Sequence, residues 1–173
     1  MSDVSDSEYR EEFVFEENPI DAFLACAEAN DWECEREMSH RCSLVAEKGS
    51  LSLSVTVHWD EVQEVVFVAI AFELECPPRQ YPALCVHLSE VSQRMVLGSF
   101  FYQREYELLI WKYGLTLAGV PGIMPDQVVM VLEYGMAEFN KQLPHIQKIV
   151  GIEDVKDVPT PQSSHAPPYG RMN

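Results

Sequence analysis

The sequence predicts an α+β domain in which helices flank an antiparallel sheet, in the order α-β-β-β-β-α-β-β-α. Residues 51–59 alternate between apolar and polar side chains without error, which is typical of a half-buried strand. Apolar residues recur at helical spacing over 20–27 and again over 129–150. Short turns join the strand-like runs, and a parallel crossover would need a dozen or more residues, so neighbouring strands are predicted to be antiparallel.

The first helix is predicted to begin after Asn18, a good N-cap, with Pro19 at its first position. Asn30 and Asp31 end it. Its apolar stripe consists of Ile20, Phe23, Leu24 and Ala27.

Four strands are predicted to follow this helix. In the first, Trp32, Cys34, Arg36 and Met38 alternate with Glu33, Glu35 and Glu37, which predicts a half-buried strand with carboxylates on its outer face. Residues 42–46 and 51–59 form the next two. Residues 65–72 are apolar on both faces, which favours a central position in the sheet.

The second half of the chain is predicted to hold a helix, a hairpin and a last helix. The helix covers residues 79–95 and turns Leu84, Leu88, Val91 and Met95 inward. The hairpin pairs residues 100–103 with 108–115 and turns near Arg104. The last helix starts at Pro125, and Pro144 is expected to kink or end it near Leu143. Its stripe consists of Val129, Leu132, Met136, Phe139, Leu143, Ile146 and Val150.

This pattern divides the chain into three parts. Residues 1–17 are polar and acidic and are expected to form a flexible arm. Residues 18–152 are expected to form a single domain, because helical and strand patterns run through them without a break. Residues 153–173 are rich in Pro and Ser with little apolar content, which predicts a disordered tail.

The net charge of the chain restricts the classes of partner that it is expected to bind. The 173 residues carry 28 acids against 12 Lys and Arg, a net charge of −16, and residues 1–38 alone hold 13 of the acids. Nucleic-acid affinity depends on Lys and Arg that neutralise phosphates, so we expect no nucleic-acid partner and no attraction to an anionic membrane. A protein or peptide partner is compatible with this charge.

The start of the sequence has neither the basic segment nor the apolar segment of an export signal. The longest apolar run, 65–72, is far shorter than the roughly 20 residues that span a bilayer. We therefore expect a soluble, cytoplasmic protein. In a reducing cytosol, its five cysteines are expected to be small, buried, hydrophobic side chains.

The order of elements and several local motifs resemble the YbjN family of bacterial proteins. The likeness covers roughly residues 18–150, and the order of its motifs is more specific than any one of them. The matching stretches are Asn18 to Asp21, Asp31 to Arg36, Leu51 to Trp59, Leu74 to Pro77, Val96 to Phe101 and Leu115 to Gly119. The chain departs from the family pattern at Arg104 to Glu107 and at Trp111 to Tyr113.

The resemblance implies a sensory transduction regulator with a fold like that of type III secretion chaperones. It further implies a non-enzymatic, bacterial, chaperone-like protein-binding module in sensory or stress signalling, and a homodimer. The resemblance implies no catalytic residues and no cofactor.

A metal- or thiol-dependent sensor or enzyme is the alternative hypothesis. Cys34, His40 and Cys42 lie on two strands joined by a turn and could converge. Zinc sites favour pairs of cysteines two to four residues apart, however, and the cysteines here are at least seven positions apart. Buried thiols are the simpler interpretation, so no metal ligand is predicted.

Hydrolytic chemistry has equally little support in the sequence. His58 and Glu64 could approach each other across a turn, but no nucleophile elbow accompanies them. We therefore expect no enzyme activity.

An aromatic cluster marks the predicted hairpin. Successive side chains of a strand point to opposite faces, so one aromatic row must meet a helix, a partner or water. Tyr and Trp are enriched at protein interfaces. The alternative is that helices cover both faces of the hairpin. The predicted partner-binding residues are Phe100, Tyr102, Tyr106, Trp111 and Tyr113.

Overall fold

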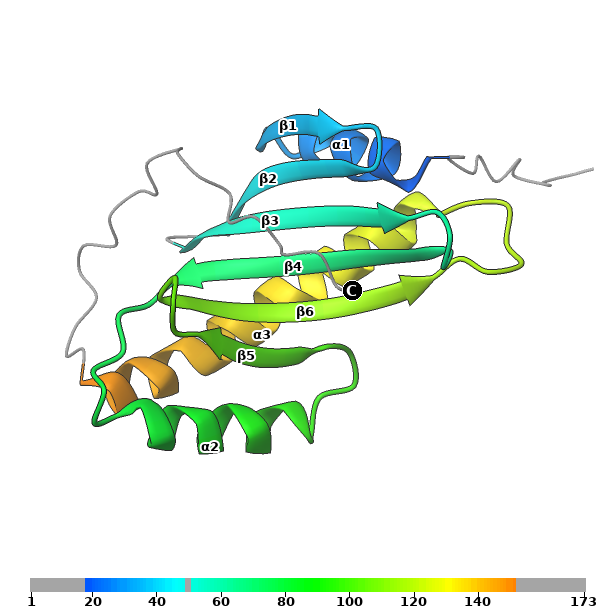
Figure 1. Ribbon diagram of the computed structural model, residues 1–173. Coiled ribbons are helices and arrows are strands. Elements are labelled where there is room, and N and C mark those ends of the chain that lie inside the picture. The colour runs from blue at the N-terminus through cyan, green and yellow to red at the C-terminus, as the bar shows by residue number, and fades with distance from the viewer. Residues whose placement is uncertain (1–17, 49–50, 152–173) are drawn as a thin grey trace, which may run out of the picture.

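The computed structural model describes residues 18–48 and 51–151. It confirms the α+β class and the predicted order of elements (Figure 1). The elements are α1 (Pro19–Ala29), β1 (Glu33–Met38), β2 (Arg41–Lys48), β3 (Leu51–Asp60), β4 (Val65–Glu73), α2 (Tyr81–Ser92), β5 (Ser99–Gln103), β6 (Leu108–Thr116) and α3 (Pro125–Val150). The predicted arm and tail lie outside the described residues.

The strands form one six-stranded sheet in the order β1-β2-β3-β4-β6-β5, and every neighbouring pair is antiparallel. The sheet is a meander as far as β4. After α2, the β5–β6 hairpin returns with β6 against β4. The strand that is apolar on both faces, β4, lies centrally between β3 and β6, as its sequence predicts.

The described helices leave one face of the sheet uncovered. In Figure 1, α1 and α3 lie behind the sheet and α2 runs beside β5 at its lower edge. The inner rows of the strands are buried against the helices: Leu53, Val55 and Val57 on β3 are at most 1% exposed. A Cβ built on Gly135 of α3 would lie 2.5 Å from Ile70 of β4 and 2.8 Å from Trp111 of β6. Glycine at this position therefore lets α3 approach the centre of the sheet.

Helix α3 differs from its prediction in two ways. It does not end near Leu143 but runs on through Pro144 to Val150. Proline removes one backbone donor, yet Leu143, Ile146 and Val150 on the buried side keep the last turns packed on the core. The buried stripe also begins at Val128, while Val129 is 40% exposed.

Strand β1 is more exposed than predicted. Its row of Cys34, Arg36 and Met38 is exposed rather than half-buried, and only the preceding Trp32 packs partly on the core. The physical reason is position: β1 is an edge strand with β2 as its single neighbour, so less of the helical layer covers it.

Candidate functional site

Most of the predicted partner-binding rings belong to the core. Phe100, Tyr102 and Trp111 are 5%, 8% and 0% exposed. The Phe100 ring meets Phe139 of α3 edge to face at 5.0 Å between centroids. The Tyr102 hydroxyl donates to the carbonyl of Leu74 at 2.8 Å. These three rings therefore contact the protein's own helices and loops and present almost no surface to a partner.

The other two predicted rings differ in exposure. Tyr113 stacks on Trp111 at 6.1 Å between centroids and is half-buried against the same core. Tyr106 lies in the β5–β6 turn and is 41% exposed. Of the five predicted residues, only Tyr106 is accessible enough to form much of a contact surface, and its role in partner binding stays a prediction.

The other row of side chains on the hairpin points to the opposite face of the sheet from Phe100 and Trp111. Phe101 pairs with Ile110 in the register of β5 and β6, and Ile110 pairs with Ala71 of β4. These residues alternate with the buried row of Phe100 and Trp111, so they lie on the side of the sheet away from the helices.

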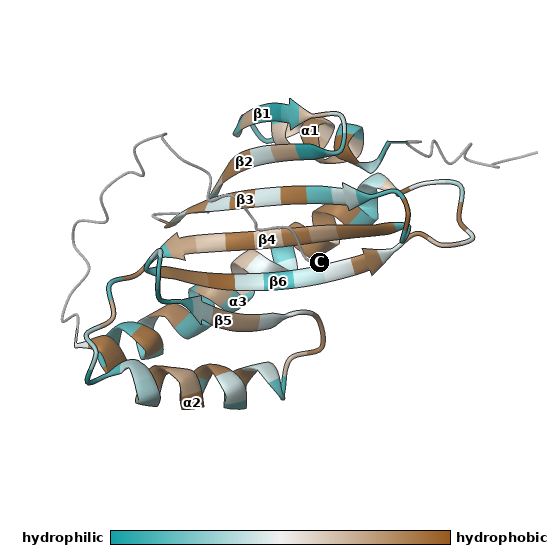
Figure 2. Ribbon diagram, viewed as in Figure 1, coloured by the Kyte–Doolittle hydropathy of each residue, from teal (hydrophilic) through white to brown (hydrophobic). Residues whose placement is uncertain are grey.

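The apolar residues of this side lie on β2, β4, β5 and β6, with the polar Ser54 and Thr56 of β3 between Val45 and the others, and we call this side the open face. Its members are Val45, Phe67, Ala69, Ala71, Phe101 and Ile110. In Figure 2, β4 is hydrophobic along most of its length. Phe101 is 38% exposed, and the members on β2 and β4 other than Ala69 are half-buried.

Basic and acidic side chains lie at different parts of the open face. The Lys112 ammonium lies 4.9 Å from the centre of the Phe67 ring, a cation–π contact within the face. Towards the β1 edge, Glu33 and Glu35 pair with Val45 and Ser43 of β2, and both carboxylates are exposed. The open face therefore combines an apolar centre with an acidic border.

Phe101 and Ile110 were not among the residues predicted from the sequence. The alternation along the hairpin was the available signal, because it requires two opposite rows. It could not show which row meets the helices, since this depends on where α3 crosses the sheet.

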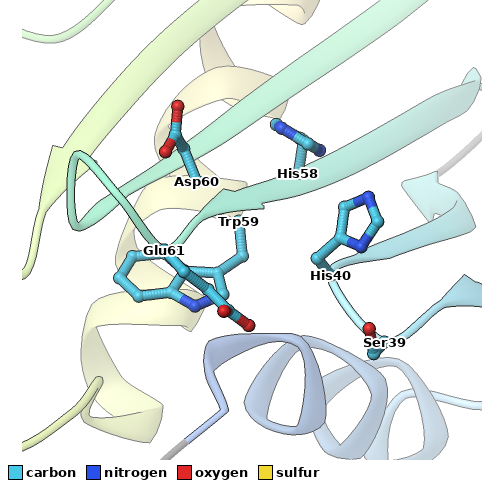
Figure 3. A pocket seen from close by; sticks show the side chains of 6 residues that line it. All are labelled: Ser39, His40, His58, Trp59, Asp60 and Glu61. Carbon is cyan, nitrogen blue, oxygen red and sulfur yellow. The ribbon is translucent and has the colours of Figure 1, made fainter.

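A shallow pocket of about 320 Å³ lies beside the end of β3 (Figure 3). Its lining residues are Ser39, His40, His58, Trp59, Asp60 and Glu61. The rings of His40 and His58 meet edge to face at 5.3 Å between centroids. Burial is the main cause that lowers the pKa of His58, followed by the charge of His40. His58 is therefore held neutral to a lower pH than an ordinary histidine.

One of the pocket's two carboxylates, that of Asp60, already has structural partners. Asp60 Oδ1 accepts from the backbone N–H groups of Val62 and Gln63, each at 3.0 Å, and so fixes the β3–β4 turn. Over residues 18–48 and 51–151, no three His, Cys, Asp or Glu side chains lie close enough together to hold a metal ion. As arranged, the pocket offers two imidazoles and an open polar surface, but no complete metal site.

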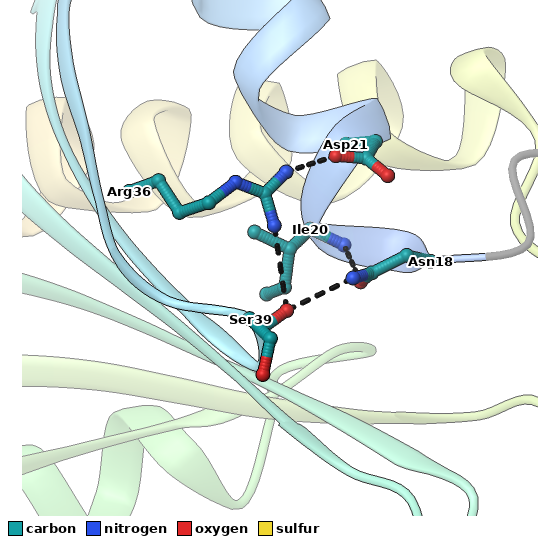
Figure 4. Close-up of polar contacts among 5 residues, drawn as sticks. All are labelled: Asn18, Ile20, Asp21, Arg36 and Ser39. Carbon is teal, nitrogen blue, oxygen red and sulfur yellow. Dashed lines mark hydrogen bonds and ion pairs between the residues drawn. The ribbon is translucent and has the colours of Figure 1, made fainter.

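Polar contacts fix the rim of this pocket to α1 (Figure 4). Asn18 caps α1 through its Oδ1, which accepts from Ile20 N at 3.0 Å, while its Nδ2 donates to the Ser39 carbonyl at 2.9 Å. Arg36 forms an ion pair with Asp21 and also donates to the Ser39 carbonyl. The β1–β2 turn is thus held by the start of α1.

The family model for YbjN, described as "Putative bacterial sensory transduction regulator", matches residues 19–148. This match covers well over half of the chain. The chain belongs to the YbjN family. No curated protein sequence matches it.

A solved YbjN structure has a similar fold. The crystal structure of YbjN from E. coli, described as "a putative transcription regulator", matches with a TM-score of 0.53 at 10% identity. The match covers 76% of this chain and 96% of that one. At this identity the likeness concerns the fold alone.

No helix in the described part of the chain is long and apolar enough to cross a membrane.

The fold of this YbjN-family chain does not gather Cys34, His40 and Cys42 into one site. Cys42 is fully buried on the helical side of β2, whereas the His40 ring lies against His58. Cys34 is exposed on β1, where it pairs with Leu44 rather than with Cys42. Burial raises the pKa of the Cys42 thiol to about 12, so this side chain is a neutral thiol at pH 7 rather than a nucleophile or metal ligand.

Proposed function

We propose that this YbjN-family protein is a non-enzymatic regulatory module that binds a protein or peptide through its open face. The observation that carries the proposal is the one-sided architecture. The helices of the described chain pack on one side of the sheet, and the other side has the apolar centre defined above. Membership of a family described as regulators supports a regulatory role.

The chemistry of the face defines the partner. An apolar segment would cover Phe67 and Phe101, and basic residues beside it would meet Glu33 and Glu35. Such charges increase the rate of association and select orientation more than they increase affinity. The net charge of −16 favours a basic protein and disfavours nucleic acid and anionic lipid as partners.

Several finer features remain part of the proposal. They are a cytoplasmic location, a homodimer and a likeness to type III secretion chaperones. Sedimentation of the purified chain over a range of concentrations tests the homodimer directly.

Affinity capture from a lysate of the native cells tests partner binding. The wild-type chain is compared with Phe101→Asp, which places a charge on the open face, and with Val62→Asp. Val62 is 94% exposed in the β3–β4 turn, so it is a matched control for charge and exposure. We expect Phe101→Asp to lose at least about tenfold of the captured protein, because a buried carboxylate is costly, and Val62→Asp to retain it.

Salt separates the two contributions to this binding. Apolar contact should persist at about 0.5 M NaCl, whereas the steering by the acidic border should fade as the screening length shortens. Equal capture by wild type and Phe101→Asp, or no specific capture by the wild-type chain, would refute the proposed function.

A further inference from the structure

Two histidine rings meet beside the end of β3. His40 lies in the β1–β2 turn and His58 near the end of β3, and their ring centroids are 5.3 Å apart with the ring planes at 81°. Within the described part of the chain, neither imidazole donates or accepts a hydrogen bond. The pocket beside the rings is open to solvent (Figure 3). The ring nitrogens are therefore accessible to a ligand from outside the chain.

The spacing of the two rings fits a shared transition-metal ion. Zinc binds imidazole nitrogen at about 2.0–2.1 Å in tetrahedral geometry. Each ring centre would then lie roughly 3.2 Å from the ion, so two tetrahedral ligands would place their ring centres roughly 5.2 Å apart. This spacing agrees with the 5.3 Å between His40 and His58. In the view of Figure 3, each ring has a nitrogen on the side that faces the other ring.

Backbone contacts fix the positions of both histidines. The Trp59 N–H donates to the His40 carbonyl at 2.8 Å, which ties the β1–β2 turn to the end of β3. The Ser39 carbonyl accepts from Asn18 Nδ2 at 2.9 Å, which ties the same turn to α1. Ligands held on fixed backbone lose less conformational entropy on binding than ligands on free loops, so the pair is preorganised.

Protonation also favours metal binding at neutral pH. Burial and the charge of His40 are the main causes that lower the pKa of His58. Arg41 and Lys112 lower it too, and Asp60 opposes them. His58 is therefore mostly a neutral imidazole at pH 7, which is the form that coordinates a metal ion.

The charges around the pair suit a cation. Asp60 and Glu61 line the same pocket. Of the two cationic side chains nearby, Arg41 is paired with Glu37 at 2.8 Å, and Lys112 lies over an aromatic ring of β4 at 4.9 Å. The net charge of the whole chain, −16, attracts cations in general.

The described chain supplies two ligands rather than a full set. Over residues 18–48 and 51–151, no third His, Cys, Asp or Glu side chain lies close enough to complete a metal site. Structural zinc sites have four protein ligands, whereas open sites keep positions for water or substrate. An ion held by two imidazoles in an open pocket is therefore exchangeable and keeps positions for outside donors.

We propose that His40 and His58 together bind one divalent transition-metal ion of the zinc class, with water in the remaining positions. The ion links the β1–β2 turn to the end of β3. This site does not depend on the proposed function, because it uses neither Phe101 nor the apolar residues of the open face.

Isothermal titration calorimetry of the full-length chain with ZnCl₂ tests the site. We expect one ion per chain at about pH 7.5. Losing even an outer-shell partner of a metal ligand costs about 10–100-fold in affinity, so His40→Asn and His58→Asn should each lose at least about tenfold. Binding should weaken at about pH 5.5, because protons compete for both imidazoles.

Two variants control for other zinc ligands. His145→Asn removes an exposed histidine of α3, and Cys34→Ser removes the exposed thiol of β1. Both should keep the wild-type affinity. Near-ultraviolet circular dichroism of the tryptophans checks that each variant is folded.

Nitrogen NMR of the wild-type chain provides a readout that needs no variant. On addition of ZnCl₂, the ring nitrogens of His40 and His58 should shift together and reach saturation at the same concentration. Shifts of neither ring, or of only one of them, would overturn the site even if an Asn variant fails to fold. A lost affinity in either control variant would place the ion elsewhere and overturn it too, as would unchanged affinity in both His40→Asn and His58→Asn.

Partner capture distinguishes this inference from the proposed function. Zinc binding through the two histidines without any captured partner would support the site and count against the function. Capture that depends on Phe101, in a chain that binds no zinc, would overturn the site and leave the function standing.

Discussion

At the scale of single residues, Gly135 shows how one missing side chain sets the distance between the two layers. An Ala at this position would place its Cβ 2.5 Å from Ile70 and 2.8 Å from Trp111, both fully buried. Gly to Ala within a helix ordinarily stabilises by up to about 1 kcal/mol. Here overpacking opposes that gain, and we expect Gly135→Ala to destabilise the protein by about 1–3 kcal/mol in urea unfolding.

Substitution to alanine on the exposed side of α3 provides the control. Asn140 is exposed, so Asn140→Ala should gain a few tenths of a kcal/mol from helix propensity alone. A stabilised Gly135→Ala variant would mean that α3 can move away from the sheet at little cost.

His87 provides a prediction on pH. Its Nε2 is buried, with no hydrogen-bond partner among the described residues. Burial is the main cause that lowers the pKa of His87, followed by His145 on α3; Arg94 lowers it too, and Glu90 opposes them. The unfolded chain therefore binds a proton near pH 6.5 that the folded chain takes up only at lower pH. Stability should fall as pH drops from 6.5 towards the folded pKa.

His87→Gln removes this contribution, so its stability should fall less steeply between pH 7 and pH 5. The measurement is the urea midpoint across that range. Ala83→Gln, at an exposed position of the same helix, should keep the wild-type slope. Identical slopes for wild type and His87→Gln would show that the histidine is solvated.

At the scale of elements, the persistence of α3 through Pro144 predicts a stabilising substitution. A proline inside a helix lacks one donor and crowds the preceding turn, at a cost of roughly 3 kcal/mol in an unadapted helix. Pro144 is exposed, so Ala would restore the donor without disturbing the core. We expect Pro144→Ala to raise the free energy of unfolding by about 1–2 kcal/mol.

Pro125 is the matched control for this substitution. It occupies the first turn of the same helix, where the missing donor has no intrahelical partner. Pro125→Ala should therefore change the stability little. If Pro144→Ala changes the stability as little as Pro125→Ala does, the last turns of α3 have already adapted to Pro144.

The elements themselves could largely be predicted from the sequence, because period and turn chemistry are local. The alternation over 51–59 became β3, and Asn18 caps α1 as expected. The start of the α3 stripe could not be predicted in the same way. Val128 and Val129 precede Leu132 by four and three residues, and both spacings suit a helix. The packing of α3 on the sheet selects Val128.

The site depended on information that is not local. Alternation showed that Phe100 and Phe101 must point to opposite faces, but only the position of α3 decides that Phe100 enters the core. Burial of Cys42 and exposure of Cys34 likewise depend on α1 and on the edge position of β1. The residues predicted for partner binding therefore lie on the same hairpin as Phe101 and Ile110, but mostly on its covered face.

At the scale of the whole molecule, the excess of acids predicts a stability that increases with salt. The described ranges contain 18 acids against nine Lys and Arg, and the whole chain carries −16. Like charges held together in a compact state repel one another more than in an unfolded chain. Four ion pairs recorded among the described residues offset only part of this repulsion, because exposed pairs contribute at most about 1 kcal/mol each.

Raising NaCl from about 0.01 M to 0.1 M shortens the screening length from about 30 Å to about 10 Å. We expect the free energy of unfolding in urea to rise by on the order of 1 kcal/mol over this range. Substituting Glu33→Gln and Glu35→Gln together should stabilise the chain at low salt and reduce the gain from added salt. Lys148→Gln should do the reverse, since it makes the net charge more negative. A stability that falls with salt would mean that attraction within the ion pairs outweighs the repulsion between the acids.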